Sequence, residues 1–262
     1  IIVSGGISFL VVIISTLIGV NYFKSRNIGQ EIQEEVNFHE HKKGTPTMGG
    51  LFIVFGTLVG YTFSHINFWT IGEGFKVELT SININVFFIF GIALLMALVG
   101  FIDDFLKVKA GRNLGLTPSQ KFLLQFLVGL LSAYYFNYLD YDSKFYFFSG
   151  LGIEVGIIKW LIVIFFIIGI TNSVNFTDGL DGLVAGSSAI SFGGILIISF
   201  WIYRHPEYYI KFIGQVFLTV EISLLLSALA GACLGFFLLN SNPANILMVS
   251  VGSHFLGSFF LL

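Results

Sequence analysis

The sequence predicts an all-α fold, a polytopic membrane bundle of about eight transmembrane helices, in which residues 1–262 form a single domain. Composition and pattern both support this class. Of the 262 residues, 55% are hydrophobic and only 11% are charged, whereas a soluble domain carries about 25% charged residues. The apolar segments are also long and continuous, unlike the alternating strands of a membrane β-barrel. The net charge of −2 gives no indication of nucleic acid, and we expect no nucleic-acid partner.

Eight apolar runs have roughly the 20 residues needed to cross a ~30 Å hydrocarbon core. They are residues 1–23, 48–64, 83–102, 119–138, 157–174, 183–203, 222–239 and 246–262. The first run lacks a basic segment and a clear cleavage site, so we interpret it as a membrane span and not as a signal peptide. The last run is barely long enough to span, and we expect short connecting loops.

Basic residues set the predicted orientation of the bundle. The loops after the first and third spans contain seven of them, whereas the loops after the second, fourth and sixth spans contain four. Because basic residues concentrate in cytoplasmic loops, we expect the odd-numbered loops in the cytoplasm and the N-terminus outside. The polar connections at 172–182 and 240–245 then also lie on the cytoplasmic side.

The stretch 172–186 is a polar island between two apolar runs. A carboxylate at the centre of a membrane helix costs about 2.5–3.5 kcal/mol, and ionisable residues at such depth usually mark function. Asp178 and Asp181 are three residues apart, hence on one face of a helix, and Gly179 and Gly182 leave the backbone open to a ligand. The alternative is a polar turn in which Asp181 caps the next helix.

Two further cytoplasmic segments carry charge beside a span. The run at 83–102 ends in Asp103 and Asp104, adjacent carboxylates that repel each other and need a cation, either a lysine or Mg²⁺. Before the second span, Lys42 and Lys43 can contact phosphates as point charges, and the Gly-Thr-Pro turn that follows offers N–H groups at a helix start. Solvated helix-end acids and a basic membrane anchor are the alternatives.

Together these residues favour Mg²⁺-assisted chemistry on a phosphate or pyrophosphate ester, in which the metal neutralises oxygens and lysines hold the leaving group. A site among membrane helices suits a lipid substrate. The sequence has no P-loop and no Ser-His-Asp order, and its histidines show no zinc-ligand spacing, so His254 has no assigned role. The residues alone predict a membrane-embedded transferase that acts on a phosphorylated lipid.

Four segments of the chain resemble one family. They are Lys42-Lys-Gly-Thr-Pro-Thr-Met-Gly-Gly50, Gly100-Phe-Ile-Asp-Asp-Phe-Leu-Lys-Val108, Asn172-Ser-Val-Asn-Phe-Thr-Asp-Gly-Leu-Asp-Gly-Leu183 and Gly231-Ala-Cys-Leu-Gly-Phe-Phe-Leu-Leu-Asn-Ser-Asn-Pro-Ala244. In these motifs the chain is similar to the phospho-N-acetylmuramoyl-pentapeptide-transferase (MraY) family of polyprenyl-phosphate sugar-1-phosphate transferases. The resemblance covers essentially the whole chain, and the motifs follow the family's order.

This resemblance implies the transfer of phospho-MurNAc-pentapeptide from UDP-MurNAc-pentapeptide to undecaprenyl phosphate, which yields lipid I and UMP in peptidoglycan synthesis, with Mg²⁺ as cofactor. It implies a multi-pass protein of the bacterial inner (plasma) membrane, surrounded by membrane lipid, with its active site on the cytoplasmic face. It is also compatible with a homodimer. Because the family has ten transmembrane helices, the resemblance implies that the domain is incomplete at its C-terminus.

The resemblance also assigns roles by motif position. Asp103 and Asp104 match the family's essential acidic pair, and Asp103 matches the group that deprotonates the lipid phosphate. Asn172 matches a metal ligand. The other matches are the uridine-loop residues Asn175, Asp178, Gly179, Leu180 and Asp181, and the nucleotide- and phosphate-site residues Lys42, Thr47, Lys107 and Asn240.

The segment Asn245-Ile-Leu-Met-Val-Ser-Val-Gly-Ser253 departs from the family pattern. Leu247 stands where the family has a Phe that stacks on uracil and binds substrate. Val249 replaces a Gly, and Ser250 stands at the position of an Asp that binds Mg²⁺. A serine hydroxyl is neutral and cannot replace an anionic ligand of a hard cation. We therefore expect weak Mg²⁺ binding and little or no turnover by this chain.

Two other functions compete with this interpretation. A related transferase that loads N-acetylglucosamine-1-phosphate onto the same lipid is expected to lack the Thr-Pro-Thr-Met-Gly-Gly segment, which is present here. A transporter, or a membrane remnant without catalysis, would use the acids as an ion path. Transporters commonly show two repeated halves with broken helices, and the sequence shows no such repeat.

Overall fold

The structure, a computed structural model, describes residues 1–26, 44–70, 74–110, 114–138, 144–147, 151–154, 158–208 and 216–260. Its helices are α1 (Ile2–Ser25), α2 (Gly50–Phe63), α3 (Ile84–Ala110), α4 (Pro118–Tyr138), α5 (Ile158–Thr177), α6 (Leu183–Arg204), α8 (Val216–Asn240) and α9 (Val249–Phe259). Its strands are β1 (Ile66–Thr70), β2 (Gly74–Leu79), β3 (Lys144–Phe147) and β4 (Leu151–Glu154). Each of the eight predicted apolar runs forms one of these helices, which confirms the predicted helical bundle.

Helix length decides which of these elements can cross a membrane. Within the described residues, five helices are long and apolar enough to do so: α1, α3, α5, α6 and most of α8. Helix α2 has 14 residues and α9 has 11, whereas a full span needs about 20. The predicted span at 246–262 therefore begins too early. Its first residues form an irregular segment that hydrogen-bonds to the chain before α2.

The connections after α2 and α4 contain β-hairpins, so the expectation of plain short loops was wrong there. Strand β1 pairs antiparallel with β2, with Ile66 opposite Leu79. Strand β3 pairs antiparallel with β4, with Lys144 opposite Glu154. These strands are only four to six residues long, and alternation over so few residues is a weak sequence signal.

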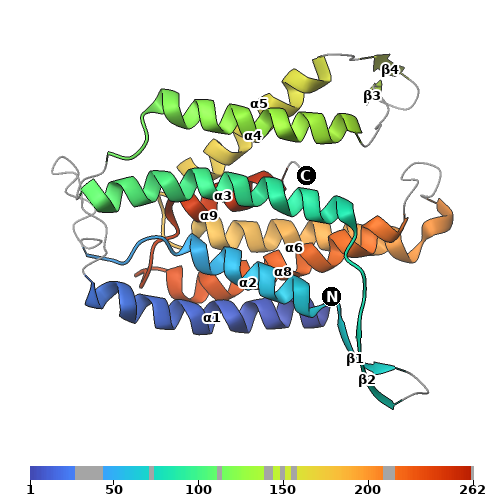
Figure 1. The fold of residues 1–262 in the computed structure, drawn as a ribbon, viewed down its shortest axis with the longest axis horizontal. Coiled ribbons are helices and arrows are strands. Elements are labelled where there is room, and N and C mark those ends of the chain that lie inside the picture. The colour runs from blue at the N-terminus through green and yellow to red at the C-terminus, as the bar shows by residue number, and fades with distance from the viewer. Residues whose placement is uncertain are drawn as a thin grey trace.

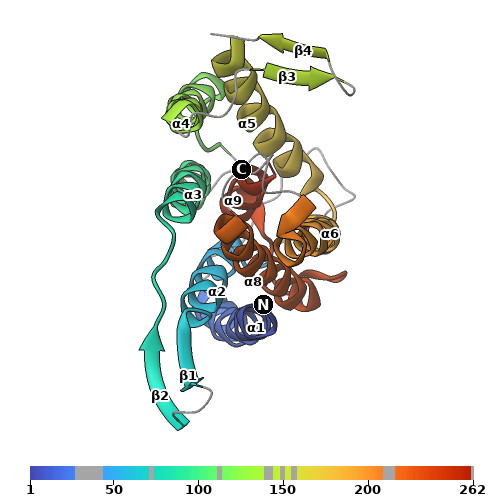
Figure 2. The same cartoon turned by 90° about the vertical axis from the view of Figure 1, so that its right-hand side faces the viewer.

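The helices run alternately up and down through the bundle. Helix α8 packs against α1, α2 and α6, and α9 packs against α2, α3 and α5, so these two helices form the centre. Viewed along the bundle, α4 and α5 lie on one side of α9 and α1 lies on the other (Figure 2). Helices α2 and α4 begin at one end of the bundle, where α1 and α3 finish, and both hairpins lie at the opposite end (Figure 1).

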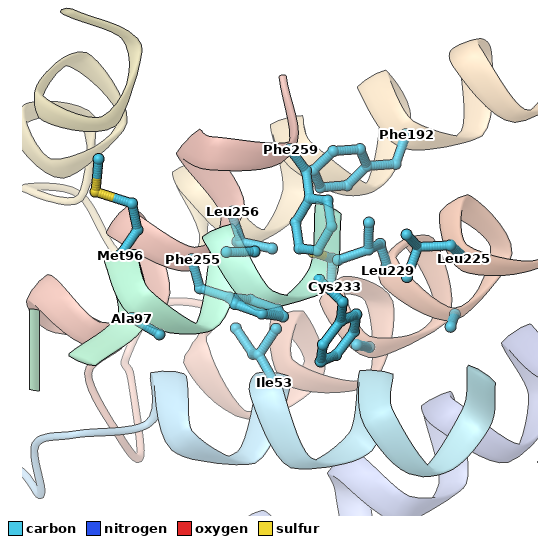
Figure 3. Close-up of a cluster of buried hydrophobic side chains, with 14 of the residues drawn as sticks. Ile53, Met96, Ala97, Phe192, Leu225, Leu229, Cys233, Phe255, Leu256 and Phe259 are labelled. Atoms are coloured by element: carbon cyan, nitrogen blue, oxygen red, sulfur yellow. The ribbon is translucent and has the colours of Figure 1, made fainter. Parts of the chain in front are cut away.

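Large apolar side chains from five helices fill the centre. Ile53, Met96, Phe192, Leu229 and Phe255 come from α2, α3, α6, α8 and α9 and are fully buried. The close-up shows Ile53, Leu229 and Phe255 gathered between the ribbons, with Met96 on the opposite side of α3 (Figure 3). Because α9 contributes a large share of this core, its first turn is held in a fixed position, and this turn carries Ser250.

The surface of the bundle is more apolar than part of its interior. Ser4 and Ser8 of α1 are completely buried and donate hydrogen bonds of 2.8 and 2.7 Å to carbonyl oxygens of α8. By contrast, Ile190 is 79% exposed and Phe165 is 72% exposed. Small hydroxyl residues between helices and large apolar residues outside are the pattern of helices that associate in lipid.

A buried polar cluster anchors the first hairpin at the end of the bundle opposite the acidic pair. The Tyr61 hydroxyl donates a hydrogen bond of 2.7 Å to Glu221 Oε2, and His65 Nε2 lies 3.4 Å from the same oxygen. His65 Nδ1 lies 3.1 Å from Thr80 Oγ1, just after β2. This cluster joins α2 and α8 to the residues that flank the β1–β2 hairpin.

Candidate active site

The predicted acidic pair lies in the last part of α3, and Lys121 in the first turn of α4 comes within 3.9 Å of Asp103. Asp103 and Asp104 are only 4% and 2% exposed. They are buried because α9 packs closely on α3 at this level, where Gly100 faces the Ser250 carbonyl and any side chain would collide with it. Two buried carboxylates need charged or hydrogen-bonding partners, and the structure provides a different set for each.

Asp103 is the centre of a charged cluster. Its Oδ2 atom lies 2.6 Å from Lys107 Nζ and 3.9 Å from Lys121 Nζ. Ser250 Oγ donates a hydrogen bond of 2.9 Å to the same oxygen, and the Leu116 N–H donates one of 2.9 Å to Oδ1. Lys107 Nζ also lies 3.4 Å from Ser250 Oγ. The cluster therefore joins α3, α4 and α9 at one point.

Asp104 instead caps α9. Its Oδ2 atom accepts a hydrogen bond of 2.9 Å from the N–H of Val251, and Lys107 Nζ lies 3.5 Å from its Oδ1 atom. The first N–H groups of a helix have no partners within the helix, and its N-terminus favours a negative charge. Asp104 thus holds the start of α9 in place, whereas Asp103 faces the lysines.

The segment before α2 pairs with the segment before α9. The N–H of Leu247 donates to the carbonyl of Pro46 at 2.8 Å, and the N–H of Gly49 donates back to the carbonyl of Leu247 at 2.9 Å. Thr47 lies within this pairing, is 6% exposed, and its Oγ1 atom has no hydrogen-bond partner among the described residues.

Both paired segments contain a residue with a left-handed backbone. Met48 has φ of 65° and Val249 has φ of 53°. A positive φ is unfavourable for residues other than glycine and most unfavourable for β-branched ones. Val249, immediately before Ser250, is therefore a strained position where the family pattern has glycine.

The last turn of α5 and the polar stretch that follows it contact α9 and the α8–α9 segment (residues 240–248). Ser253 Oγ donates a hydrogen bond of 2.8 Å to Asn175 Oδ1. Asn240 accepts a hydrogen bond of 3.0 Å from the N–H of Gly182 and donates one of 2.8 Å to the carbonyl of Ile246. The predicted motifs at 42–50, 100–108 and 172–183 therefore meet along residues 240–253.

Asp181 completes this connection. Its Oδ2 atom accepts a hydrogen bond of 3.3 Å from the N–H of Ala244. The residue at the N-cap of α6 is Gly182, with φ of 75°, and no side chain caps this end of the helix. The alternative in which Asp181 serves as the helix cap is therefore not what the structure shows.

The remaining predicted residues differ in their surroundings. Asp178 is half-buried in the turn after α5, and Gly179 and Leu180 are exposed there. The side chain of Asn172 faces α4 and hydrogen-bonds to Gln125. Lys42 lies outside the described residues.

The sequence did not single out Lys121, Ser253, Gln125 or His254, although all four lie at or directly beneath the acids. One signal was available for Lys121. It occupies the first turn of α4, where a cation is disfavoured by the helix dipole, so a nearby anion was to be expected. His254 was visible as a lone histidine inside the last apolar run, although no role was assigned to it. For Ser253 and Gln125 no sequence signal was visible.

The oxygen donors suit a hard cation only in part. Mg²⁺ is commonly bound through one or two carboxylates, with substrate phosphates and water completing its shell, and Asp103 and Asp104 are such a pair. Across the described ranges no group of three or more His, Cys, Asp or Glu side chains could hold a metal. Asp103 and Asp104 are therefore the described residues that could hold Mg²⁺ together with a substrate phosphate.

The fold and the site together define a class of protein. Two lysines beside a buried carboxylate provide positive charge for phosphate oxygens, and membrane-length helices surround them. An integral-membrane transferase for phosphate esters has these features. A family model described as glycosyl transferase family 4 matches residues 85–262, which contain both acids and the α8–α9 segment.

The particular family follows from the matches to a signature and to whole proteins. The model for phospho-N-acetylmuramoyl-pentapeptide-transferase signature 1 matches residues 42–54. Enzymes with this name from Oceanobacillus iheyensis, Salinispora arenicola and Corynebacterium aurimucosum are 35%, 34% and 35% identical to the chain. The alignments cover 96%, 98% and 98% of this chain and 70%, 75% and 73% of those relatives. The chain belongs to the phospho-N-acetylmuramoyl-pentapeptide-transferase family.

Proposed function

We propose that this chain transfers phospho-MurNAc-pentapeptide from its UDP carrier to undecaprenyl phosphate, forming lipid I and UMP at the cytoplasmic face of a bacterial inner membrane. One observation carries the proposal. The segment that matches the family signature pairs through its backbone with residues 247–248, and Ser250, two residues further on, donates to Asp103. The family-specific segment and the charged cluster are therefore parts of one site.

The cluster provides groups for each part of the transfer. An oxygen of the lipid phosphate attacks the phosphorus that carries the sugar, and the bond from this phosphorus to the UMP oxygen breaks. Negative charge on the transferred group and on UMP is stabilised by Lys107 and Lys121. Preorganised cations of this kind are usually the largest contribution to phosphoryl transfer.

Asp103 is the candidate proton acceptor for the lipid phosphate. Its Oδ2 atom is in contact with Lys107 and Ser250, so substrate entry must first draw Lys107 toward a phosphate oxygen. That movement frees one carboxylate oxygen to take the proton. Asp104 keeps α9 in position throughout, because its bond to Val251 lies on the other side of the pair.

Mg²⁺ would be held by Asp103 and Asp104 and, when bound, would neutralise pyrophosphate oxygens. Ser250 contributes only a neutral hydroxyl, which predicts weak metal binding without substrate. The uridine is proposed to lie near Asn175, Asp178 and Asp181, because Asn175 and Asp181 are held against the α8–α9 segment. A homodimer stays a prediction.

The competing function is transfer of N-acetylglucosamine-1-phosphate, and it can be tested directly. The purified chain is incubated with undecaprenyl phosphate, Mg²⁺ and either UDP-MurNAc-pentapeptide or UDP-N-acetylglucosamine, and lipid products and UMP are identified by mass spectrometry. We expect lipid I alone, at a low yield because of Ser250, and none from Asp103→Asn. A lipid-linked N-acetylglucosamine as the main product would overturn the proposal.

A further inference from the structure

Beneath the charged cluster lies a buried network of three side chains from three helices. Gln125 of α4 and His254 of α9 are 1% and 0% exposed. Gln125 and Asn172 of α5 exchange two amide hydrogen bonds of 2.9 and 3.2 Å. Gln125 Nε2 lies 2.9 Å from His254 Nε2, and His254 Nδ1 lies 2.8 Å from the Ser250 carbonyl.

Backbone carbonyls at both ends fix the direction of every bond in this network. The Ser250 carbonyl only accepts, so His254 Nδ1 carries the proton and Nε2 accepts from Gln125. At the other end, Asn172 Nδ2 donates to the carbonyl of Ile168 at 2.8 Å, which directs its oxygen toward Gln125 Nε2. The amide hydrogens of both Gln125 and Asn172 are thereby used. A fully satisfied buried network of this kind specifies one arrangement of its helices.

Each member of the network lies one helical turn below a residue of the site. Gln125 is four residues after Lys121, and His254 is four residues after Ser250. Asn172 is three residues before Asn175. Residues three or four apart lie on the same face of a helix. The buried network therefore also fixes the relative positions of the site residues that lie one turn away on α4, α5 and α9.

We propose that Gln125, Asn172 and His254 are positioning residues that hold Lys121 and Ser250 at Asp103, and Asn175 at Ser253. This inference rests on the proposed function. It also gives Asn172 a role other than that of a metal ligand, because its amide hydrogen-bonds to Gln125 and to the carbonyl of Ile168. The bond between Gln125 and His254 is the critical one, since it joins α4 directly to α9 below the acids.

Two substitutions at His254 separate positioning from general support of the fold. His254→Gln can place an acceptor oxygen where Nε2 lies and keep the bond to Gln125. His254→Asn is too short to reach Gln125 and loses that bond, although it remains polar. The matched control is Ser199→Ala, which removes a buried hydroxyl that donates to the Thr219 carbonyl at 2.9 Å near the opposite end of α6.

The first measurement does not depend on turnover. The rate at which an amine-reactive reagent modifies Lys121 in the intact 262-residue chain is followed by peptide mass spectrometry. We expect His254→Asn to raise this rate at least fivefold, and His254→Gln and Ser199→Ala to leave it within about twofold, because only the first variant releases the register of α4 against α9. Equal rates for the two His254 variants would overturn the inference.

The second measurement is the rate of lipid I formation. A displacement of about 1 Å in a reacting group lowers turnover on the order of 10²-fold, so His254→Asn should lower kcat at least tenfold while KM for UDP-MurNAc-pentapeptide stays nearly constant. His254→Gln should retain most of the activity. If the parent chain makes too little lipid I for rates to be compared, the modification of Lys121 decides the inference, and the proposed function is decided separately by the affinity for UDP-MurNAc-pentapeptide.

Discussion

Replacing Ser250 with aspartate should convert a weak Mg²⁺ site into a tighter one. Ser250 Oγ lies 2.9 Å from Asp103 Oδ2 and 3.4 Å from Lys107 Nζ, so a carboxylate here adds a third anionic oxygen donor to the pair in α3. Mg²⁺ prefers such donors to a neutral hydroxyl. Ser250→Asn has nearly the same size as Ser250→Asp and no charge, and it serves as the matched control.

The magnitude follows from the charges around this position. Two unit charges 4 Å apart interact by about 4 kcal/mol at an effective dielectric constant of about 20. Without metal, a new carboxylate meets two carboxylates and two lysines, whose contributions oppose each other. Because Mg²⁺ carries two charges, its attraction for the new carboxylate is about twice that of a unit charge. Removing the carboxylate and the ion from water offsets much of this attraction, because position 250 is buried and Ser250 is only 3% exposed. We therefore expect at least about 1.4 kcal/mol, which is tenfold in Kd.

Isothermal titration of the detergent-solubilised chain with MgCl₂ measures this effect. Ser250→Asp should bind Mg²⁺ at least tenfold more tightly than the parent chain, and Ser250→Asn should bind no better than the parent. Addition of Leu247→Phe and Val249→Gly should further raise affinity for UDP-MurNAc-pentapeptide. Tight Mg²⁺ binding or full activity in the unmodified chain would refute the assignment of Ser250 to the metal position.

Three further substitutions test separate parts of the account. Val249→Gly should raise the free energy of unfolding by about 1 kcal/mol. The left-handed backbone at this position destabilises a β-branched residue by more than glycine loses through the greater entropy of its unfolded chain. An unchanged melting temperature would argue against strain. Asp181→Ala should weaken binding of UDP-MurNAc-pentapeptide more than that of undecaprenyl phosphate, and equal losses in a binding assay would mean that it only supports the fold. Tyr61→Phe should lower stability by about 1–3 kcal/mol through the loss of its bond to Glu221, and any change in UDP-sugar affinity would contradict its placement at the far end.

The sequence predicted the helices well because long apolar runs are a strong signal. Most helix ends lie within about three residues of the predicted run, but α3 continues eight residues beyond its run, to Ala110, and α8 begins six residues before its run, at Val216. The run at 246–262 was wrong as a full membrane span, because α9 has only 11 residues. Residues 247–248 of this run instead pair with the chain at the start of α2, and their apolar composition alone does not reveal such pairing. The hairpins were missed because their strands are too short to show a period.

The site could be predicted only where its chemistry is concentrated in sequence. Asp103 and Asp104 are adjacent, so their mutual repulsion was visible without a structure. Lys121 and Gln125 come from α4, whereas Ser253 and His254 come from α9. Their proximity depends on how α4, α5 and α9 are set in register, and this is a tertiary property that a single sequence does not display.

The central claim is that the charged cluster at Asp103 serves a site for UDP-MurNAc-pentapeptide. Calorimetric titration of the chain with this nucleotide and with UDP-N-acetylglucosamine, each in the presence of Mg²⁺, tests the claim most directly. The ratio of the two affinities does not depend on turnover or on how weakly the metal binds. The account predicts at least tenfold tighter binding of UDP-MurNAc-pentapeptide, or about 1.4 kcal/mol, and weaker binding in Asp181→Ala. Equal affinities, or a preference for UDP-N-acetylglucosamine, would contradict it.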